Sequence, residues 1–222
     1  MILLSGLYSS GNAVRDAEMR LCLQKNGGNT AFGDIYVFCE GDFSWAEDIE
    51  YNKILKQYRN MFIGGFVKRM TYKTYLETAN VRFKDGTIVC LANSDIYFDS
   101  TISLIKPEHL DNVFMCLSRW KHNPDGPPTP DLQAKGGSDA WIFKTPVRVP
   151  AKSDFTQGHI ACDNRIAWLM QQEGYKLENP ASSVHAIHVH ASNFRSYGWE
   201  TDLLYDKGVP GVPWTEVSAV SR

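Results

Sequence analysis

The sequence lacks the motifs of several common enzyme classes. It contains no glycine pattern of a phosphate loop or a dinucleotide fingerprint, which weakens kinase-like and dehydrogenase interpretations. It also has no Gly-x-Ser-x-Gly elbow and no His-Glu-x-x-His pair. No apolar run approaches the length of a membrane span, and the start Met-Ile-Leu-Leu-Ser has no basic leader segment. These absences predict a cytoplasmic protein without a membrane span.

The sequence also has a small net charge and no closely paired cysteines. The 23 Lys and Arg residues nearly balance the 25 Asp and Glu residues, giving a formal net charge of −2. This balance disfavours nucleic acid as a partner, although a local basic groove is compatible with it. The five cysteines form no CxxC pair, and four of them lie in apolar runs. They are therefore predicted to be reduced core residues.

What the sequence does contain is an alternation of strand-like and helix-like segments. Residues 2–8 and 34–39 have the apolar composition of buried strands. Between them, Asn12 can cap a helix that ends at Asn26-Gly27-Gly28. This strand, helix, strand order predicts parallel pairing through a right-handed crossover. The length of 222 residues suits one well-buried domain.

The rest of the chain continues this alternation. We predict helices at 46–60, 72–79 and 160–173, strands at 87–92, 113–118, 141–144 and 184–190, and loops at 123–128 and 136–137. The tail at about 198–222 is rich in Trp, Gly and Pro without a clear period, and is predicted to be irregular. The predicted fold class is α/β, with a central, mostly parallel sheet flanked by helices.

The apolar run at 87–92 ends abruptly in Asn93-Ser94-Asp95. In open α/β sheets, ligands bind at the carboxyl ends of such strands. If the strand continues, Asn93 and Asp95 point to the same side and offer hard oxygens that suit Mg²⁺ or Mn²⁺. This pattern suggests a site for a metal and a diphosphate. The alternative is an Asx-turn that only ends the strand.

A second candidate is the histidine-rich run near the C-terminal end of the predicted elements. On a strand, His188 and His190 share one face, whereas His185 lies on the other. A neutral imidazole from this pair would complete a metal shell that Asp95 begins. The alternative is that these histidines are ordinary polar residues.

Two carboxylates are candidates for proton transfer. Asp163 lies where a loop enters a predicted helix, so it can be an N-cap or a general base for an attacking hydroxyl. Asp139 is the competing carboxylate, which can bind an acceptor or merely occupy a turn. Trp141 lies close to Asp139 and is a possible platform for a sugar, although tryptophans are more often core residues.

Arginines near the first loop can hold phosphate oxygens through bidentate contacts. Arg15 lies near the start of the first predicted helix, beside the loop that begins Tyr8-Ser9. Helix N-termini also favour phosphate. Arg69 is the second candidate. We therefore expect Tyr8, Ser9, Arg15 and Arg69 to contact a nucleotide.

Eight segments, in a specific order, carry a resemblance to a known family. They are Arg15-Asp16-Ala17-Glu18, Cys22-Leu23-Gln24-Lys25-Asn26, Arg69-Met70-Thr71-Tyr72, Ala92-Asn93-Ser94-Asp95-Ile96-Tyr97-Phe98-Asp99, Leu117-Ser118-Arg119-Trp120, Ser138-Asp139-Ala140-Trp141-Ile142-Phe143, Cys162-Asp163-Asn164-Arg165-Ile166-Ala167 and His188-Val189-His190-Ala191-Ser192. In this order they resemble a small GT-A type glycosyltransferase of viruses or bacteria. The N-terminal glycosyltransferase domain of a chlorella-virus protein is an example of that group.

The resemblance implies one GT-A-like domain with two halves. Residues 1–99 or so would bind the nucleotide sugar, and about 100–197 would form the acceptor and catalytic half. Asp95 would be the last acid of a DxD element that binds Mn²⁺ or Mg²⁺, while Asn93 stands where the first acid usually is. The C-terminal metal ligand would be His188 or His190. The implied donor-binding residues are Tyr8, Ser9, Arg15, Arg69, Asn93, Ser94 and Asp95.

The same resemblance places Asp163 at the position of the catalytic base in inverting members. Retaining members use the scaffold differently, so the stereochemistry stays open. Asp139 and Trp141 would contact the acceptor. The implied activity is metal-dependent transfer of a sugar from a nucleotide sugar, a UDP-sugar, to an acceptor hydroxyl, most simply that of a glycan. Two other classes stay open: a metal-dependent nucleotide-sugar hydrolase or nucleotidyltransferase, and a non-catalytic nucleotide-sugar-binding module.

Overall fold

A central sheet of seven strands, in the order β10-β6-β9-β4-β1-β2-β3, organises the structure, which is a computed structural model. The structure describes residues 1–41, 49–66, 68–134, 136–159 and 161–192. The sheet strands are β1 (Ile2–Leu7), β2 (Asp34–Glu40), β3 (Met61–Phe66), β4 (Ile88–Ala92), β6 (Val113–Leu117), β9 (Ala140–Lys144) and β10 (Lys176–Glu178). Strand β9 runs antiparallel to both of its neighbours, and every other pairing in this sheet is parallel. The prediction of a mostly parallel α/β sheet is confirmed.

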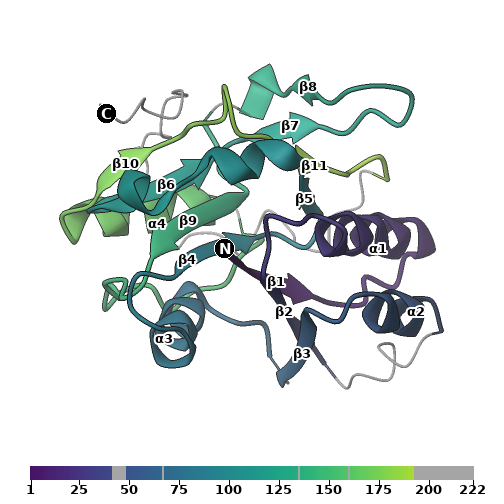
Figure 1. Cartoon of the computed structure of the whole chain (residues 1–222), viewed down its shortest axis with the longest axis horizontal. Helices are drawn as coiled ribbons and strands as arrows, with labels where there is room; N and C mark the ends of the chain where they lie inside the picture. The colour runs from purple at the N-terminus through teal and green to yellow at the C-terminus, as the bar shows by residue number, and fades with distance from the viewer. Residues whose placement is uncertain (42–48, 67, 135, 160, 193–222) are drawn as a thin grey trace.

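Within the described residues, four α-helices cover the two faces of this sheet (Figure 1). They are α1 (Ala13–Gly27), α2 (Ile49–Gln57), α3 (Tyr72–Arg82) and α4 (Cys162–Gln172). Side chains of α1 and α2 belong to one buried cluster, and those of α3 and α4 belong to another. Because strand side chains alternate between faces, Val89 and Leu91 of β4 join the second cluster, while Cys90 and Ala92 join the first.

The first helix begins where the sequence indicates. Asn12 is extended, and its side-chain oxygen accepts hydrogen bonds from the backbone N–H groups of Val14 and Arg15. These bonds satisfy two donors that a helix start leaves unpaired. The five cysteines are free and buried, as predicted. No helix in the described ranges is long and apolar enough to cross a bilayer.

A smaller second sheet lies beside helix α1. It contains β5 (Ile96–Phe98), β11 (Ala186–His188), β7 (Arg119–Lys121) and β8 (Thr129–Pro130), in that order. Short 3-10 helices span Ser100–Leu104, Pro107–Leu110 and Leu132–Ala134. Strand β11 pairs antiparallel with β5 and parallel with β7. Asn26 of α1 joins the helix to this sheet, because its side chain donates to the Ile96 carbonyl and accepts from the Phe98 N–H.

Several predicted elements need correction. Strand β4 ends at Ala92 and does not continue through Asn93 and Asp95. Strand β11 is shorter than predicted and excludes His190. Strands β3, β5, β7, β8 and β10 were not predicted, since they are short or, in β3, interrupted by two glycines. Residues 46–48, residue 160 and the tail at 198–222, for which predictions were made, lie outside the described residues.

Candidate functional site

The candidate site lies at the carboxyl ends of β1 and β4. These strands are neighbours. The helix that follows β1 and the helix that precedes β4 cover opposite faces of the sheet. Such a reversal of strand order opens a crevice beyond the strand ends, and ligands bind there in open α/β sheets. Asn93, Ser94 and Asp95 occupy a turn at this point, closed by a 3.2 Å hydrogen bond from the Ile96 N–H to the Asn93 carbonyl.

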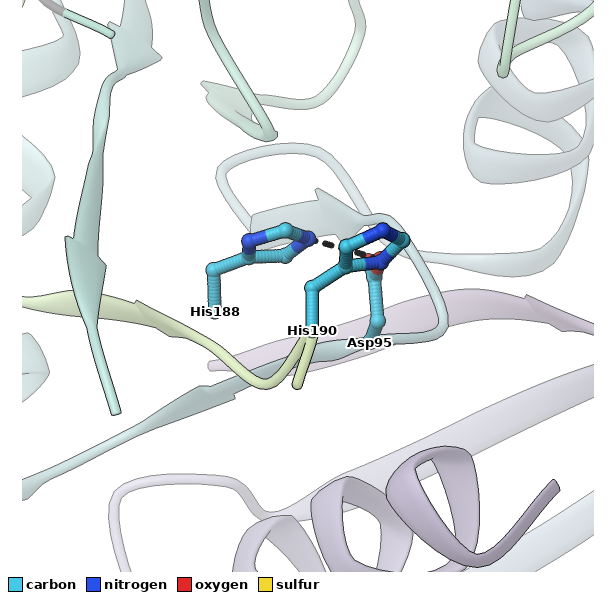
Figure 2. A group of neighbouring side chains, drawn as sticks. All are labelled: Asp95, His188 and His190. Carbon is cyan, nitrogen blue, oxygen red and sulfur yellow. Dashed lines mark hydrogen bonds and ion pairs between the residues drawn. The ribbon is translucent and has the colours of Figure 1, made fainter. Parts of the chain in front are cut away.

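Asp95, His188 and His190 converge in space (Figure 2). His188 Nε2 lies 2.8 Å from Asp95 Oδ2, and the two imidazole rings stack with centroids 5.2 Å apart. One ligand atom from each of the three side chains lies within 4.8 Å of the other two. The turn after β4 therefore meets the segment that begins with β11. The predicted sharing of one face by the two histidines is observed, although His190 lies beyond the strand.

His190 is a candidate metal ligand. Both of its ring nitrogens are buried, and neither has a hydrogen-bond partner within the described ranges. Burial lowers the pKa of His190, and the positive charge of Arg15 lowers it further. The imidazole is therefore neutral near pH 7, which is the form that coordinates metals. Because an unpaired buried nitrogen costs free energy, the arrangement favours a ligand that fills it.

Asp95 is held as a carboxylate. Burial alone would raise the pKa of Asp95, but the charges and hydrogen bonds of His188 and Arg15 outweigh burial and hold it well below its usual range. The pKa of His188 shifts in the opposite direction. Burial lowers it, but the charge and hydrogen bond of Asp95 raise it by more, so the net shift is upward. The site thus keeps a negative charge at the end of β4.

Arg15 forms a buried ion pair with Asp95, which corrects its predicted role in donor binding. Its side chain is only 7% exposed, and the guanidinium bonds Asp95, Glu18 and the carbonyl of Val189. With these contacts the guanidinium is not presented to a phosphate. Glu18, which sequence analysis did not single out, is buried and also accepts hydrogen bonds from the backbone and hydroxyl of Ser192. The only sequence signal for it is its spacing of three residues after Arg15 on a helix.

Asp163 lies in the first turn of α4. The N-cap is Ala161 in a left-handed conformation, so Asp163 is not the N-cap. Its Oδ2 accepts a 2.8 Å hydrogen bond from the Ser138 backbone. Burial raises the pKa of Asp163; the Ser138 bond opposes this shift, and the nearby charge of Asp139 adds to it. A carboxylate with a raised pKa is better matched to accepting a proton near neutral pH.

Asp139 belongs to a polar network beside the candidate metal ligands. Its two carboxylate oxygens accept from Asn93 Nδ2 at 2.9 Å and from Arg119 Nη1 at 3.5 Å. Arg119 also binds Asp131 at 3.1 Å, so it ties the β7 strand to two separate loops. Asn93 therefore faces Asp139 and does not share a ligand position with Asp95. Neither Arg119 nor Asp131 carried a predicted role, because each is an isolated charge in the sequence.

Trp141 is a core residue, which corrects its predicted role as a sugar platform. It is 0% exposed on β9, and the Tyr72 ring packs against it edge to face at 5.0 Å. A fully buried ring has no face to offer to a carbohydrate.

Tyr8 and Arg69 meet near the carboxyl end of β1. The Arg69 guanidinium lies 5.1 Å from the centre of the Tyr8 ring and binds both oxygens of Glu40 at 3.1 Å. Burial raises the pKa of Glu40, partly offset by Arg69. Ser9 is exposed and Ser94 is half-buried. The structure thus brings two predicted nucleotide contacts together and adds Glu40, which ends β2.

Comparisons with known proteins agree with this architecture. A mannosyltransferase, PcManGT from Pyrobaculum calidifontis, solved with GDP-Man and Mn²⁺, is similar with a TM-score of 0.53 and 10% identity over 84% of this chain and 56% of that one. A 4-diphosphocytidyl-2C-methyl-D-erythritol synthase from Anaerococcus prevotii has a TM-score of 0.52 and 13% identity over 90% and 91% of the two chains. No family model matches the sequence, and no curated protein does.

These similarities establish the fold. The chain has a GT-A-like fold, with a seven-stranded, mostly parallel sheet flanked by helices. It spans about half the length of the mannosyltransferase that it matches. The suggested resemblance to a chlorella-virus domain stays a prediction.

Proposed function

We propose that this protein is a metal-dependent glycosyltransferase that moves a sugar from a nucleotide sugar to an acceptor hydroxyl. The observation that carries the proposal is the convergence of Asp95, His188 and His190 beyond the carboxyl end of β4 in a GT-A-like sheet. The similarity to a mannosyltransferase solved with GDP-Man and Mn²⁺ supports both a sugar-nucleotide donor and a divalent metal.

The three side chains fit a divalent metal. Their ligand atoms lie within 4.8 Å of one another, and ligands of an octahedral ion at about 2.1 Å are about 3 to 4 Å apart. Such an ion would fill one of the two buried ring nitrogens of His190 that have no hydrogen-bond partner within the described ranges. When bound, the ion would neutralise the charge of the leaving nucleoside diphosphate. Asp95, His188 and His190 would hold it.

Tyr8 and Arg69 would bind the nucleotide, together with Ser9 and Ser94 at the ends of β1 and β4. The Tyr8 ring offers an aromatic surface for a base, and Arg69 keeps its side chain 30% exposed while Glu40 fixes its orientation. The sequence resemblance favours a UDP-sugar as donor. The acceptor most consistent with this function is a glycan hydroxyl.

Asp163 would act as the general base. As the acceptor oxygen bonds to the anomeric carbon, the bond from that carbon to the diphosphate oxygen breaks, and the acceptor proton passes to the Asp163 carboxylate. Its raised pKa suits this task. Asp139, oriented by Asn93 and Arg119, would contact the acceptor. A single displacement of this kind inverts the anomeric configuration, so the configuration of the product tests the role of Asp163.

Nucleotidyl transfer is the second candidate. The similarity to the 4-diphosphocytidyl-2C-methyl-D-erythritol synthase, which extends over 91% of that chain, favours it. The two reactions release different products: glycosyl transfer releases a nucleoside diphosphate, whereas nucleotidyl transfer from a nucleoside triphosphate releases pyrophosphate.

The deciding experiment incubates the protein with a panel of UDP-, GDP- and CDP-sugars and a mixture of glycan acceptors, with Mn²⁺ or with EDTA. Mass spectrometry should find one hexose or pentose added to an acceptor, only with metal. An Asp163→Asn variant should form the product about 10²- to 10⁴-fold more slowly. Hydrolysed donor without a glycosylated acceptor contradicts the transferase proposal, and pyrophosphate release from a nucleoside triphosphate and a sugar phosphate would replace it with the second candidate.

A further inference from the structure

Glu18 is a buried carboxylate that the proposed chemistry does not use. It is 6% exposed and lies on α1, behind the metal ligands. Its oxygens accept hydrogen bonds from the Ser192 N–H at 2.7 Å, the Ser192 hydroxyl at 2.9 Å and Arg15 Nη1 at 3.0 Å. A carboxylate is rarely buried unless its hydrogen bonds and ion pairs offset the free energy lost when it is removed from water.

The Arg15–Glu18 pair joins the two chain segments that supply the metal ligands. Arg15 binds Asp95 after β4 and also the Val189 carbonyl after β11. Glu18 binds Ser192, three residues further along the second segment. His190 lies between Val189 and Ser192, and its ring makes no hydrogen bond of its own within the described ranges. The backbone on both sides of His190 is therefore fixed by α1, and this is what places its ring next to His188.

Charge gives Glu18 a second effect. Both imidazoles must be neutral when they bind a metal, so in that state the Arg15 guanidinium offsets the one negative charge that the three ligands supply, that of Asp95. Glu18 restores one net negative charge to the buried group, which attracts a divalent cation in a region of low dielectric. Without Glu18, the charges of Asp95, Arg15 and the two neutral imidazoles would add up to zero.

We propose that Glu18 is a positioning residue that sets the affinity of the Asp95, His188 and His190 site for its divalent cation. It does so by holding Ser192, and hence His190, and by offsetting the charge of Arg15. This inference rests on the proposed function in one respect, namely that these three residues bind a metal. Groups that orient metal ligands typically change affinity by about 10- to 100-fold when removed.

The test measures Mn²⁺ binding to the full chain by calorimetry and by the loss of the free-ion EPR signal, without substrates. Glu18→Gln keeps the size of the side chain and removes its charge, and should weaken Mn²⁺ binding about 10- to 100-fold. Ser192→Ala leaves the Arg15–Glu18 pair intact and should weaken binding by a smaller factor. Glu77→Gln, which removes an exposed acid of helix α3, is the matched control and should bind like the wild type.

The outcomes separate the two proposals. If Glu18→Gln and Ser192→Ala bind Mn²⁺ with the dissociation constant of the wild type, the proposed role of Glu18 is wrong. The proposed metal site is then unaffected. A wild type that binds no divalent cation contradicts the metal-dependent function itself. Should Glu18→Gln fail to fold, as judged by circular dichroism, Ser192→Ala decides: weaker binding supports the inference, and unchanged binding overturns it.

Discussion

His188 Nε2 lies 2.8 Å from Asp95 Oδ2, although 93 residues separate the two in the sequence. The contact forms because β11 inserts beside β5, the strand that starts directly after Asp95. The pairing brings His188 opposite Ile96, one residue from Asp95. The position of the candidate metal site is therefore a direct result of strand register in the small sheet, and a slip of one residue would turn His188 to the opposite face.

Asp95→Asn should remove metal binding and also destabilise the fold. The substitution keeps the side-chain volume but leaves Arg15 buried with one fewer anion. Breaking a buried ion pair in this way typically costs about 3 to 5 kcal/mol. Urea unfolding monitored by circular dichroism should show a lower midpoint, and calorimetry should show no Mn²⁺ binding. Wild-type stability in the variant would show that the Arg15–Asp95 pair does not form in solution.

His190 and His185 should respond in opposite ways to substitution. His190→Gln should weaken Mn²⁺ binding with little loss of stability, because its ring nitrogens form no hydrogen bonds in the described structure. His185→Gln loses a partly exposed contact to Asp99, which is worth about 0.5 to 1 kcal/mol, and should bind Mn²⁺ like the wild type. Calorimetry and thermal unfolding of the two variants check both effects. Equal Mn²⁺ affinity in the two variants would contradict the assignment of His190 as a ligand.

The pH dependence of turnover should report the Asp163 carboxylate. Because burial raises its pKa, a base at this position becomes active only as the pH rises above the ordinary range for aspartate. We expect kcat to fall on the acid side with an apparent pKa above the usual value. Asp163→Asn should reduce kcat by about 10²- to 10⁴-fold. An acid limb that persists unchanged in the residual activity of this variant would assign the titration to another group.

The same pKa shift makes a stability prediction with a defined sign. A raised pKa means that the folded protein binds this proton more tightly than the unfolded chain does. The resulting stabilisation is complete below the unfolded pKa and is lost as the pH rises through the folded pKa. At pH 7 the buried charge of Asp163 therefore lowers the free energy of unfolding. Asp163→Asn should be at least as stable as the wild type in thermal unfolding. A clearly lower melting temperature would show that the Ser138 hydrogen bond needs the charge.

Metal selection should favour Mn²⁺ over Mg²⁺. Two of the three candidate ligands are imidazoles, whereas Mg²⁺ prefers a shell of oxygens and releases its water reluctantly. An ion bound only by the folded state raises stability by about 2.7 kcal/mol at 100 times its dissociation constant. Thermal shifts should thus appear at much lower concentrations of Mn²⁺ than of Mg²⁺. An equal response to both ions, also seen in His190→Gln, would point to binding elsewhere.

The parts of the fold that could be predicted from sequence are those with strong local signals. Asn12 caps α1, and the runs of β1, β2 and β4 are apolar and bounded by turn residues. The short strands β5, β7 and β10 carry no such signal, because three residues are too few to show a period and their pairing is decided by distant partners.

The candidate site also has residues that the sequence predicts and residues that it does not. Asp95, His188 and His190 were identified from residue type, spacing and order, and the structure brings them together. The functions of Arg15, Glu18 and Arg119 depend on which charge lies opposite, and a linear sequence does not contain that information. Trp141 shows the converse, since its position next to Asp139 in the chain does not reveal that its ring turns into the core.

The order of the strands in the small sheet has a consequence for biosynthesis. Strand β11 lies between β5 and β7, both of which leave the ribosome long before it does. A nascent or truncated chain that stops short of Ala186 would contain the strands β1 to β4. However, β5 and β7 would have no strand between them, and two of the three candidate metal ligands would be missing. Such a chain would keep the scaffold proposed to bind the nucleotide, but it could not complete the proposed metal centre. Competence for the proposed reaction thus arises only when synthesis has passed the histidines.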